Sequence, residues 1–356
     1  MRPQHSKIPL GALLALLATA ATVALAAVAA PRDYSVGKNT VNGKGEGKPT
    51  FLQLMRKEEE DVEIFKRKQP STPPDQQDSD PFANYTYQGT FTSTRMQTNS
   101  PTPPKGRTIV IGDIHGSLAG FNGFLDAIKF ESSKDDLILA GDLVAKGPQS
   151  LEVIDKANQL GASCVRGNHD DKVIRWKGYL DSLKPSERDS LPDLPSDLVE
   201  NSDHHHIAAK MNDDQYQYML GCPLILSLPS KLSAQKVPIH VIHAGVDPKR
   251  DLRKQLPWVL TNIRNVLDDG TPSRKHKHGD GWSDIFNELQ SSKSKKNIEE
   301  YMVVYGHDAG RSLNVKTWTV GLDTGCVYGG SLSGYVVETG QVISVPCPDA
   351  PSDIDD

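Results

Sequence analysis

An α/β (α+β) fold is predicted for this 356-residue chain, with two mixed β-sheets packed face to face and flanked by helices. Two observations lead to it. From residue 108 to residue 176, apolar strand segments alternate with helical segments, as in parallel strands joined by crossover helices. From residue 224 to residue 345, strand segments predominate. A strand-rich half that follows a βαβ half predicts a second sheet facing the first.

The first half is expected to hold three strands, each followed by a helix. The strands are short apolar runs bounded by turn residues, at Thr108–Ile111, Leu137–Ala140 and Ser163–Val165. The helices follow at Leu118–Ile128, Leu151–Leu160 and Asp171–Trp176. Helices and loops are then expected over Leu180–Met219, with a polar insertion at Pro185–His206.

The second half is expected to consist mainly of strands. The apolar runs that predict them lie at Leu224–Leu228, Val237–Ile242, Met302–Tyr305, Lys316–Gly321, Leu332–Val337 and Gln341–Val345. Together with the first half they define a catalytic domain at residues 105–347, followed by an acidic tail at residues 348–356.

The N-terminal region is predicted to lie outside this domain. Residues 1–30 contain a long uncharged apolar run after Arg2 and Lys7, which favours an uncleaved signal anchor with its basic end in the cytosol. A cleaved signal peptide is the alternative, because small residues lie near the end of the run, around Ala27 and Ala30. Residues 31–104 are expected to form a mostly disordered stalk. Within it, Asn84 begins a glycosylation sequon that fits a lumenal side.

Composition excludes some function classes. The net charge is −5 and aromatic residues make up 6% of the chain, so neither a basic surface nor a stacking platform for nucleic acid is expected. The four cysteines have neither zinc-finger nor disulfide-framework spacing. Cys164 is expected to be an inert residue of a buried strand. Cys222, Cys326 and Cys347 could pair in an oxidising compartment, and the sequence does not say which do.

Five strand segments end at a glycine beside a residue that binds metals. They are Gly112-Asp113-Ile114-His115-Gly116, Gly141-Asp142, Gly167-Asn168-His169-Asp170, His243-Ala244-Gly245 and Gly306-His307. Parallel α/β sheets place their sites beyond the carboxyl ends of the strands, so these side chains are expected at one edge. Carboxylate, amide and imidazole ligands together suit two borderline divalent ions. Asp142 is the best candidate for a carboxylate that both ions share.

Such a centre predicts hydrolysis of a phosphate ester or anhydride. Two ions would acidify a water that bridges them and neutralise the phosphate oxygens during an in-line displacement. His169, next to Asn168, could protonate the leaving oxygen. Other histidines are not assigned to the site. His240 is expected to be a core residue, and His204, His205, His206, His276 and His278 are expected in solvated loops.

These motifs resemble those of the calcineurin-like metallophosphatases of the phosphoprotein-phosphatase type. The resemblance covers residues 107–345 through GDIHG, GDLVAKG, RGNHD, HAG and YGHD. It implies a first metal held by Asp113, His115 and Asp142, and a second held by Asp142, Asn168, His243 and His307. It also implies that His169 is the general acid. Zinc or cobalt is favoured for the two ions, and manganese or iron is an alternative.

One motif departs from the pattern GDxVDRG of the protein Ser/Thr phosphatases. Ala145 replaces its second aspartate, which would orient the acid histidine. Lys146 replaces an arginine, so it keeps a cation that would contact phosphate but loses the bidentate grip. The resulting motif resembles that of the ApaH-like branch of the family, which is related to diadenosine tetraphosphate hydrolases. The branch implies Arg311 as a further phosphate contact. Arg166 is another candidate, with a structural salt bridge as the alternative.

The anchor narrows the resemblance to the fungal vacuolar endopolyphosphatases that depend on zinc or cobalt. It implies internal cleavage of inorganic polyphosphate by a single-pass type II protein of the vacuole membrane, with the catalytic domain in the lumen. Lys249–Lys296 carries a local excess of basic residues that would attract a polyanion, or that are scattered solvated charges. The alternatives are a Ser/Thr protein phosphatase, a dinucleoside-polyphosphate hydrolase and, from another class, a catalytically inactive adaptor. No nucleic-acid partner is expected.

Overall fold

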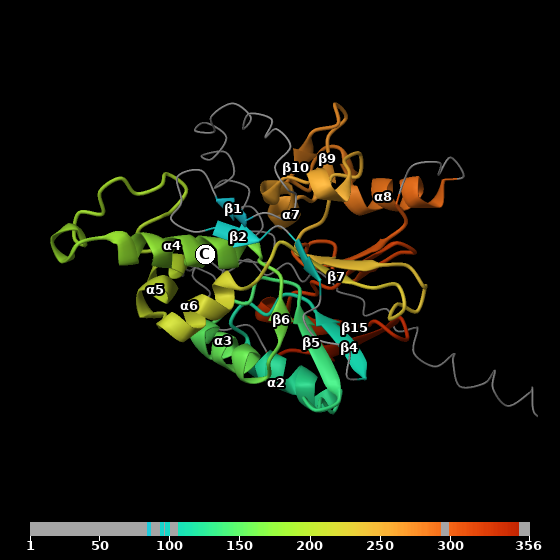
Figure 1. The fold of residues 1–356 in the computed structure, drawn as a ribbon, viewed down its shortest axis with the longest axis horizontal. Helices are drawn as coiled ribbons and strands as arrows, with labels where there is room; N and C mark the ends of the chain where they lie inside the picture. The colour runs from blue at the N-terminus through green and yellow to red at the C-terminus, as the bar shows by residue number, and fades with distance from the viewer. Residues whose placement is uncertain (1–83, 87–92, 96, 100–105, 293–298, 349–356) are drawn as a thin grey trace, which may run out of the picture. The chain divides into compact units, whose positions relative to one another are not determined.

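The computed structural model describes residues 84–86, 93–95, 97–99, 106–292 and 299–348 (Figure 1). The predicted anchor, most of the predicted stalk and nearly all of the predicted acidic tail lie outside the described residues. Within the described ranges, no helix combines the length and the apolar character needed to cross a membrane. The backbone of the sequon residue Asn84 lies in a short hairpin of β1 (Asn84–Thr86) and β2 (Ser93–Arg95).

One sheet has five strands, in the order β16-β15-β4-β5-β6. Its parallel part consists of β4 (Arg107–Ile111), β5 (Asp135–Leu139) and β6 (Ser163–Cys164). The hairpin of β15 (Ser331–Val336) and β16 (Gln341–Pro346) joins it antiparallel along β4. The sheet is therefore mixed, with its parallel strands all in the N-terminal half of the domain.

The other sheet has six strands, in the order β13-β14-β12-β8-β7-β3. They are β13 (Asn314–Val315), β14 (Thr319–Gly321), β12 (Met302–Tyr305), β8 (Ile239–Ile242), β7 (Ile225–Leu228) and β3 (Gln97–Asn99). The predicted strand Lys316–Gly321 is shorter than expected, because the chain turns between β13 and β14, which pair antiparallel. Strand β3 precedes the predicted domain start at residue 105 and pairs with β7, so this part of the predicted stalk belongs to the sheet.

The two sheets pack face to face through a shared apolar core, as predicted. Val110 and Ile138 of one sheet belong to the same buried cluster as Val241 and Val304 of the other. The neighbouring residues in β4 and β5 point the opposite way, towards helices, because side chains alternate between the faces of a strand. Both faces of the parallel strands are thus buried, which explains why their sequences are continuous apolar runs rather than alternating ones.

Helices cover the outer face of the five-stranded sheet (Figure 1). They are α2 (Leu118–Ala127), α3 (Ser150–Gln159), α4 (Asn168–Ser182) and α6 (Asp213–Leu220). The predicted insertion holds the short helix η1 (Pro185–Glu187) and α5 (Asp203–Lys210), and α5 packs against α4. Helix α4 begins three residues earlier than predicted, because the ligand motif itself forms its first turn.

The segment between β8 and β12 covers the other sheet. It contains η2 (Leu252–Lys254), α7 (Pro257–Asn262), α8 (Trp282–Ser291) and a three-stranded sheet of β10 (Pro272–Ser273), β9 (Asn265–Val266) and β11 (Asp280–Gly281). The sequence analysis did not predict this small sheet. Its two-residue strands are too short to show any periodicity.

Two disulfides connect the four cysteines. Cys164 pairs with Cys222, and Cys326 pairs with Cys347. The expectation that Cys164 is an inert strand residue is therefore wrong. Cys164 does end a buried strand, but α6 brings Cys222 to it from 58 residues away, which no local pattern reveals. Cys326 lies in η3 (Cys326–Tyr328), after β14.

Candidate metal centre

The six predicted metal ligands all lie just beyond strand ends, at the edge that the sequence indicates. Asp113 follows β4, Asp142 follows β5 and Asn168 follows β6, while His243 follows β8 and His307 follows β12. His115, Asp142 and His307 have left-handed backbone conformations, with φ values of 47°, 51° and 68°. Non-glycine residues adopt this conformation at a cost of about 1–3 kcal/mol, and such residues cluster at functional sites.

Asp142 lies at the centre of the cluster. Its Oδ2 is 3.5 Å from His115 Nε2 and 3.3 Å from His243 Nε2. Two groups of side chains converge closely enough to hold a cation, and Asp142 belongs to both. One group adds His115 and His169, and the other adds His243 and His307. This arrangement fits the predicted role of Asp142 as a carboxylate shared by two ions.

Backbone carbonyls orient the three histidine ligands. The Nδ1 atoms of His115 and His243 lie 3.0 Å and 2.9 Å from the carbonyl oxygens of Val144 and Ala140. When Nδ1 donates to a carbonyl, the Nε2 lone pair is left for a metal. His307 uses its Nε2 for the carbonyl of Asn262 instead, at 3.1 Å. Each ring therefore has one nitrogen bound to the backbone and one left for an ion.

Asp113 and Asn168 complete the ligand set. The Asp113 carboxylate accepts a hydrogen bond from the His307 amide, and its Oδ2 lies 3.8 Å from His115 Nε2. Asn168 Oδ1 lies 3.0 Å from His243 Nε2. Asp113 and Asn168 thus place their oxygen atoms beside ring nitrogens of the histidine ligands. The donors present thus fit two divalent cations.

The charge balance of the site also calls for cations. Burial, followed by the neighbouring carboxylates of Asp323 and Asp142, raises the pKa of Asp113 well above its usual range. Burial, followed by the charge of Lys146, lowers the pKa of His115 to about 4, so this ring is neutral and can bind a metal.

The sequence analysis missed Asp323, which lies in the segment after β14. Leu322 separates it from Gly321, so it lacks the glycine-ligand pattern of the other strand ends.

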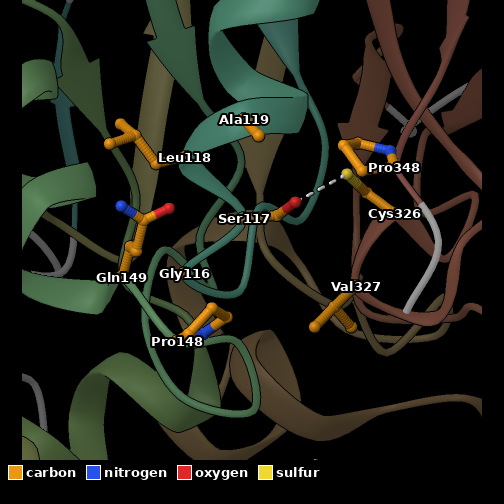
Figure 2. A pocket seen from close by; sticks show the side chains of 9 residues that line it. All are labelled: Gly116, Ser117, Leu118, Ala119, Pro148, Gln149, Cys326, Val327 and Pro348. Carbon is orange, nitrogen blue, oxygen red and sulfur yellow. Dashed lines mark hydrogen bonds between the residues drawn. The ribbon is translucent and has the colours of Figure 1, made fainter. Parts of the chain in front are cut away.

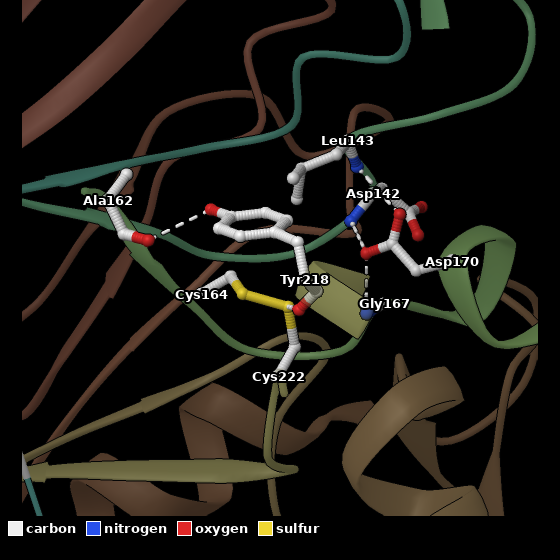
Figure 3. The surroundings of a disulfide bond; sticks show 8 residues. All are labelled: Asp142, Leu143, Ala162, Cys164, Gly167, Asp170, Tyr218 and Cys222. Carbon is white, nitrogen blue, oxygen red and sulfur yellow. Dashed lines mark hydrogen bonds between the residues drawn. A yellow bond between two sulfur atoms is a disulfide. The ribbon is translucent and has the colours of Figure 1, made fainter. Parts of the chain in front are cut away.

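Asp170 binds the backbone of the two turns that carry Asp142 and Asn168 (Figure 3). Its carboxylate accepts hydrogen bonds from the amides of Asp142, Leu143 and Gly167, at 2.8, 2.9 and 3.0 Å. It therefore holds the turns after β5 and β6 together. Burial, and next the charge of Asp142, raises the pKa of Asp170 to about 7. The sequence analysis quoted Asp170 within the third motif but assigned it no role.

His169 lies between the ligands and the insertion. Its amide donates to Asp142 Oδ1 at 2.9 Å, and its Nδ1 lies 2.9 Å from His204 Nε2. The expectation that His204 and His205 lie in a solvated loop is wrong, because both belong to α5, where His205 stacks on Trp176. His206, on the same helix, is exposed.

The sequence analysis left three more histidines unassigned, and their contacts are with other residues than the metal ligands. His240 is a buried residue beside Ser227, as expected of a core histidine. His278 is exposed. His276 lies in a loop, as expected, but it is half-buried and its Nε2 lies 3.2 Å from Asp308 Oδ1.

The predicted phosphate contacts have different surroundings. Lys146 Nζ lies 3.4 Å from His115 Nε2, beside the metal centre. Arg166 is buried with Nη1 3.4 Å from Asp171 Oδ1, which favours the salt-bridge alternative. The Arg311 guanidinium bonds to Asp308 and Asn265 and so fastens the loop that carries His307. Of these three cations, Lys146 is the one placed next to a metal ligand.

A pocket opens on the other side of the first ligand loop (Figure 2). It is lined by Gly116, Ser117, Leu118, Ala119, Pro148, Gln149, Cys326, Val327 and Pro348. Figure 2 shows the Cys326 sulfur beside the Ser117 hydroxyl, at 3.4 Å. No charged side chain lines this pocket, so it does not suit a phosphate group.

Comparison with known proteins places this site in a family. The model of the calcineurin-like phosphoesterases matches residues 106–348. The symmetrical bis(5'-nucleosyl)-tetraphosphatase of Aeromonas salmonicida is 28% identical over 67% of this chain and 97% of that enzyme. An asymmetrical bis(5'-nucleosyl)-tetraphosphatase of Oceanobacillus iheyensis is 25% identical over 66% of this chain and 90% of that enzyme.

A solved structure agrees with these relatives. The crystal structure of a candidate diadenosine tetraphosphatase has a TM-score of 0.57 and 30% identity, and the match covers 72% of this chain and 99% of that one. The relatives thus favour the ApaH-like branch over a fungal polyphosphatase. Family, ligand set and charge balance agree on a metal-dependent phosphoesterase, and the chain belongs to the calcineurin-like phosphoesterase family.

Proposed function

We propose that this protein hydrolyses a phosphoanhydride bond of dinucleoside tetraphosphates. The observation that carries the proposal is the convergence of His115, His243 and His307 on Asp142 in a chain whose relatives are named as tetraphosphatases. This was the alternative to polyphosphate in the sequence analysis. The relatives give it more support than polyphosphate has.

The residues of the site have distinct expected roles. Asp113, His115 and Asp142 would hold one divalent ion, and Asp142, Asn168, His243 and His307 the other. When bound, such ions supply positive charge for the phosphate oxygens and activate a water. Lys146 adds a cation beside His115 that can bind a non-bridging phosphate oxygen. His169 would transfer a proton to the leaving oxygen. Burial lowers the pKa of His169, and the negative charge of a bound phosphate opposes this effect.

The departures from the protein-phosphatase pattern support an anhydride substrate. Ala145 and Lys146 both have left-handed backbone, with φ values of 70° and 69°. A nucleoside phosphate is a more stable leaving group than a serine alkoxide. Its departure therefore depends less on a bidentate arginine, which this loop lacks.

A substrate comparison tests the proposal. Purified full-length protein is incubated with diadenosine tetraphosphate, long-chain polyphosphate or a phosphoserine peptide, each with zinc, cobalt or manganese. Anion-exchange chromatography separates the products. We expect diadenosine tetraphosphate to be cleaved fastest, giving two ADP in a symmetrical reaction or ATP and AMP in an asymmetrical one. An absence of adenine nucleotide products with every metal would refute the proposal.

Inorganic polyphosphate is a second candidate substrate. The exposed basic residues Lys249, Arg253 and Lys277 favour it. In the same segment, Arg250 lies 3.7 Å from Asp247 and Lys254 lies 3.8 Å from Asp251. That pairing weakens the attraction for a polyanion. Shortening of polyphosphate on a gel at a rate above that of diadenosine tetraphosphate would favour this candidate.

We also propose an oxidising location. Disulfides persist in secretory and extracellular compartments and are rare in the cytosol, and this protein has two. A lumenal catalytic domain behind an N-terminal membrane anchor, as in a vacuole, is one such location. Protease protection of the protein in sealed vesicles checks it. Digestion without detergent would contradict a lumenal domain.

A further inference from the structure

The partner of the acid histidine comes from an unexpected part of the chain. His204 Nε2 lies 2.9 Å from His169 Nδ1, and the two ring centroids are 5.0 Å apart. His204 belongs to α5, 35 residues along the chain from His169. Its side chain is therefore directed into the site from the insertion, whereas His206 on the same helix is exposed.

Helix α5 is fixed in place at its N-terminus. Ser202 caps it by accepting a hydrogen bond from the His205 amide. Asp203 Oδ2 accepts a hydrogen bond from the Lys146 amide at 2.7 Å, which ties the helix to the active-site loop. His205 stacks on Trp176 of α4 with the centroids 4.3 Å apart. Contacts on both sides of His204 thus hold its ring against His169.

This contact fills a role that the active-site loop cannot fill. Position 145 is an alanine, so the loop offers no carboxylate to orient His169. We propose that His204 is a positioning residue for His169: it accepts a hydrogen bond from His169 Nδ1 and so fixes the ring that donates a proton through Nε2. The inference rests on the proposed function, in which His169 is the acid.

The proton balance is simple. In the acid form both nitrogens of His169 are protonated, and Nδ1–H donates to the lone pair of His204 Nε2. As the bond between phosphorus and the leaving oxygen breaks, the Nε2 proton passes to that oxygen. His169 becomes neutral and keeps its Nδ1 proton, so the bond to His204 persists through the step. A proton from water later restores the acid form.

A leaving-group comparison tests this role without relying on the natural substrate. His204→Ala and the control His206→Ala are assayed with phenyl phosphate, whose leaving group needs a proton, and p-nitrophenyl phosphate, whose leaving group needs one much less. We expect His204→Ala to lower kcat for phenyl phosphate about tenfold, because a misplaced acid loses part of the roughly 10²–10⁴-fold that general acid catalysis contributes. The loss for p-nitrophenyl phosphate should be much smaller. His206→Ala should match the wild type. Equal losses on both substrates would overturn the inference.

A double-mutant cycle separates positioning from a general loss of structure. In a His169→Ala background, we expect His204→Ala to cause no further loss of kcat for phenyl phosphate. A full additional loss would mean that His204 does not act through His169. His204→Gln, which keeps a hydrogen-bonding group at similar reach, should recover part of the activity, and it replaces the alanine variant if that variant does not fold.

A spectroscopic measurement needs no substrate at all. In ¹⁵N-histidine-labelled protein, we expect a hydrogen-bonded ring N–H signal that is lost in His204→Ala and retained in His206→Ala. Its persistence in His204→Ala would overturn the contact. If diadenosine tetraphosphate is not cleaved but the aryl phosphates behave as described, the proposed substrate fails and the role of His204 stands.

Discussion

The two ends of β4 and β5 hold aspartates in opposite electrostatic surroundings. At the amino end, Asp135 accepts hydrogen bonds from Arg107 Nε and Nη2 at 2.8 Å and 2.7 Å. These bonds lower the pKa of Asp135. At the carboxyl end, Asp113 is buried near Asp323 and Asp142, and its pKa is raised well above the usual range. The same sheet therefore carries an aspartate paired with an arginine at one end and, at the other, a buried aspartate that has two carboxylates as neighbours.

This difference distinguishes a structural carboxylate from a functional one. Arginine already neutralises Asp135, so this aspartate contributes to stability and needs nothing else. At the other end, burial and the neighbouring carboxylates of Asp323 and Asp142 destabilise the charged form of Asp113 until cations bind. Their burial is thus a cost to folding that metal binding offsets. Changes at the carboxyl end should affect activity and metal affinity, and changes at the amino end should affect stability alone.

The largest effect is expected from Asp142→Asn. The amide keeps the shape of the side chain but removes the negative charge that both ligand groups share. We expect activity to fall by more than about 10³-fold. Without this charge both ions bind more weakly, and they stabilise the charge that develops in the transition state less well. Initial rates with diadenosine tetraphosphate measure the fall in activity. Asp126→Asn, at an exposed position of α2, is the matched control and should behave as the wild type. Near-normal activity of Asp142→Asn would show that the carboxylate is not shared.

Metal removal should have the next largest effect. Ligand binding to the folded state alone stabilises a protein by about 3–4 kcal/mol per ion at 100–1,000 times the dissociation constant. Treatment with a chelator should therefore lower the unfolding midpoint, and added zinc or manganese should restore it. Urea denaturation measures the change. An identical curve with and without chelator would contradict the idea that cations balance the buried carboxylates.

The disulfide at the carboxyl end of β6 offers a comparable test of stability. Replacing Cys164 and Cys222 together by alanine removes a link across 58 residues. We expect a loss of about 2–4 kcal/mol in the free energy of unfolding. Cys164 precedes Gly167 by three residues, and the Gly167 amide donates a hydrogen bond to Asp170 (Figure 3). Without the disulfide this turn should be held less firmly, so activity should also fall. Unchanged stability after the double substitution would mean that α6 holds this turn without the disulfide.

The smallest effect is expected at the amino end. Arg107→Leu should destabilise the protein by about 1 kcal/mol at pH 7, since the guanidinium is partly exposed and screened by solvent. The pKa of Asp135 is lowered in the folded protein, so this stabilisation is present above the unfolded pKa and is lost as the pH falls through the folded one. The difference in the free energy of unfolding between variant and wild type should therefore shrink in acid.

Lys134→Leu is the control, because Lys134 forms an exposed pair with Glu131, and it should change this free energy little at any pH. A loss of activity in Arg107→Leu would contradict the claim that the amino end of the sheet affects stability alone.

The sequence was sufficient for the strand ends because short-range rules determine them. An apolar run, a glycine and a ligand predict both the strand and the position of the side chain. The glycines serve two purposes. Gly116 and Gly141 have positive φ values of 63° and 93°, as a tight turn requires. Gly167 and Gly306 instead leave space, since a side chain there would overlap the carboxylates of Asp142 and Asp113.

The features that the sequence did not reveal depend on long-range packing. His204 looked like part of a polar loop because its contact with His169 exists only once α5 packs on α4. The pairing of Cys164 likewise depends on where α6 ends. Arg311 was expected to bind phosphate, and its bonds to Asp308 and Asn265 could not be read from a motif. Local sequence thus predicted the ligands better than the residues that position them.

Metal stoichiometry tests the central claim most directly. The full-length protein is reconstituted with zinc or manganese, dialysed, and its metal content measured by inductively coupled plasma mass spectrometry. We expect two ions per chain in the wild type, two in Arg107→Leu and fewer than one in Asp142→Asn. A wild-type protein that retains no metal, or an Asp142→Asn variant that retains two ions, would contradict a centre in which buried carboxylates are completed by two cations.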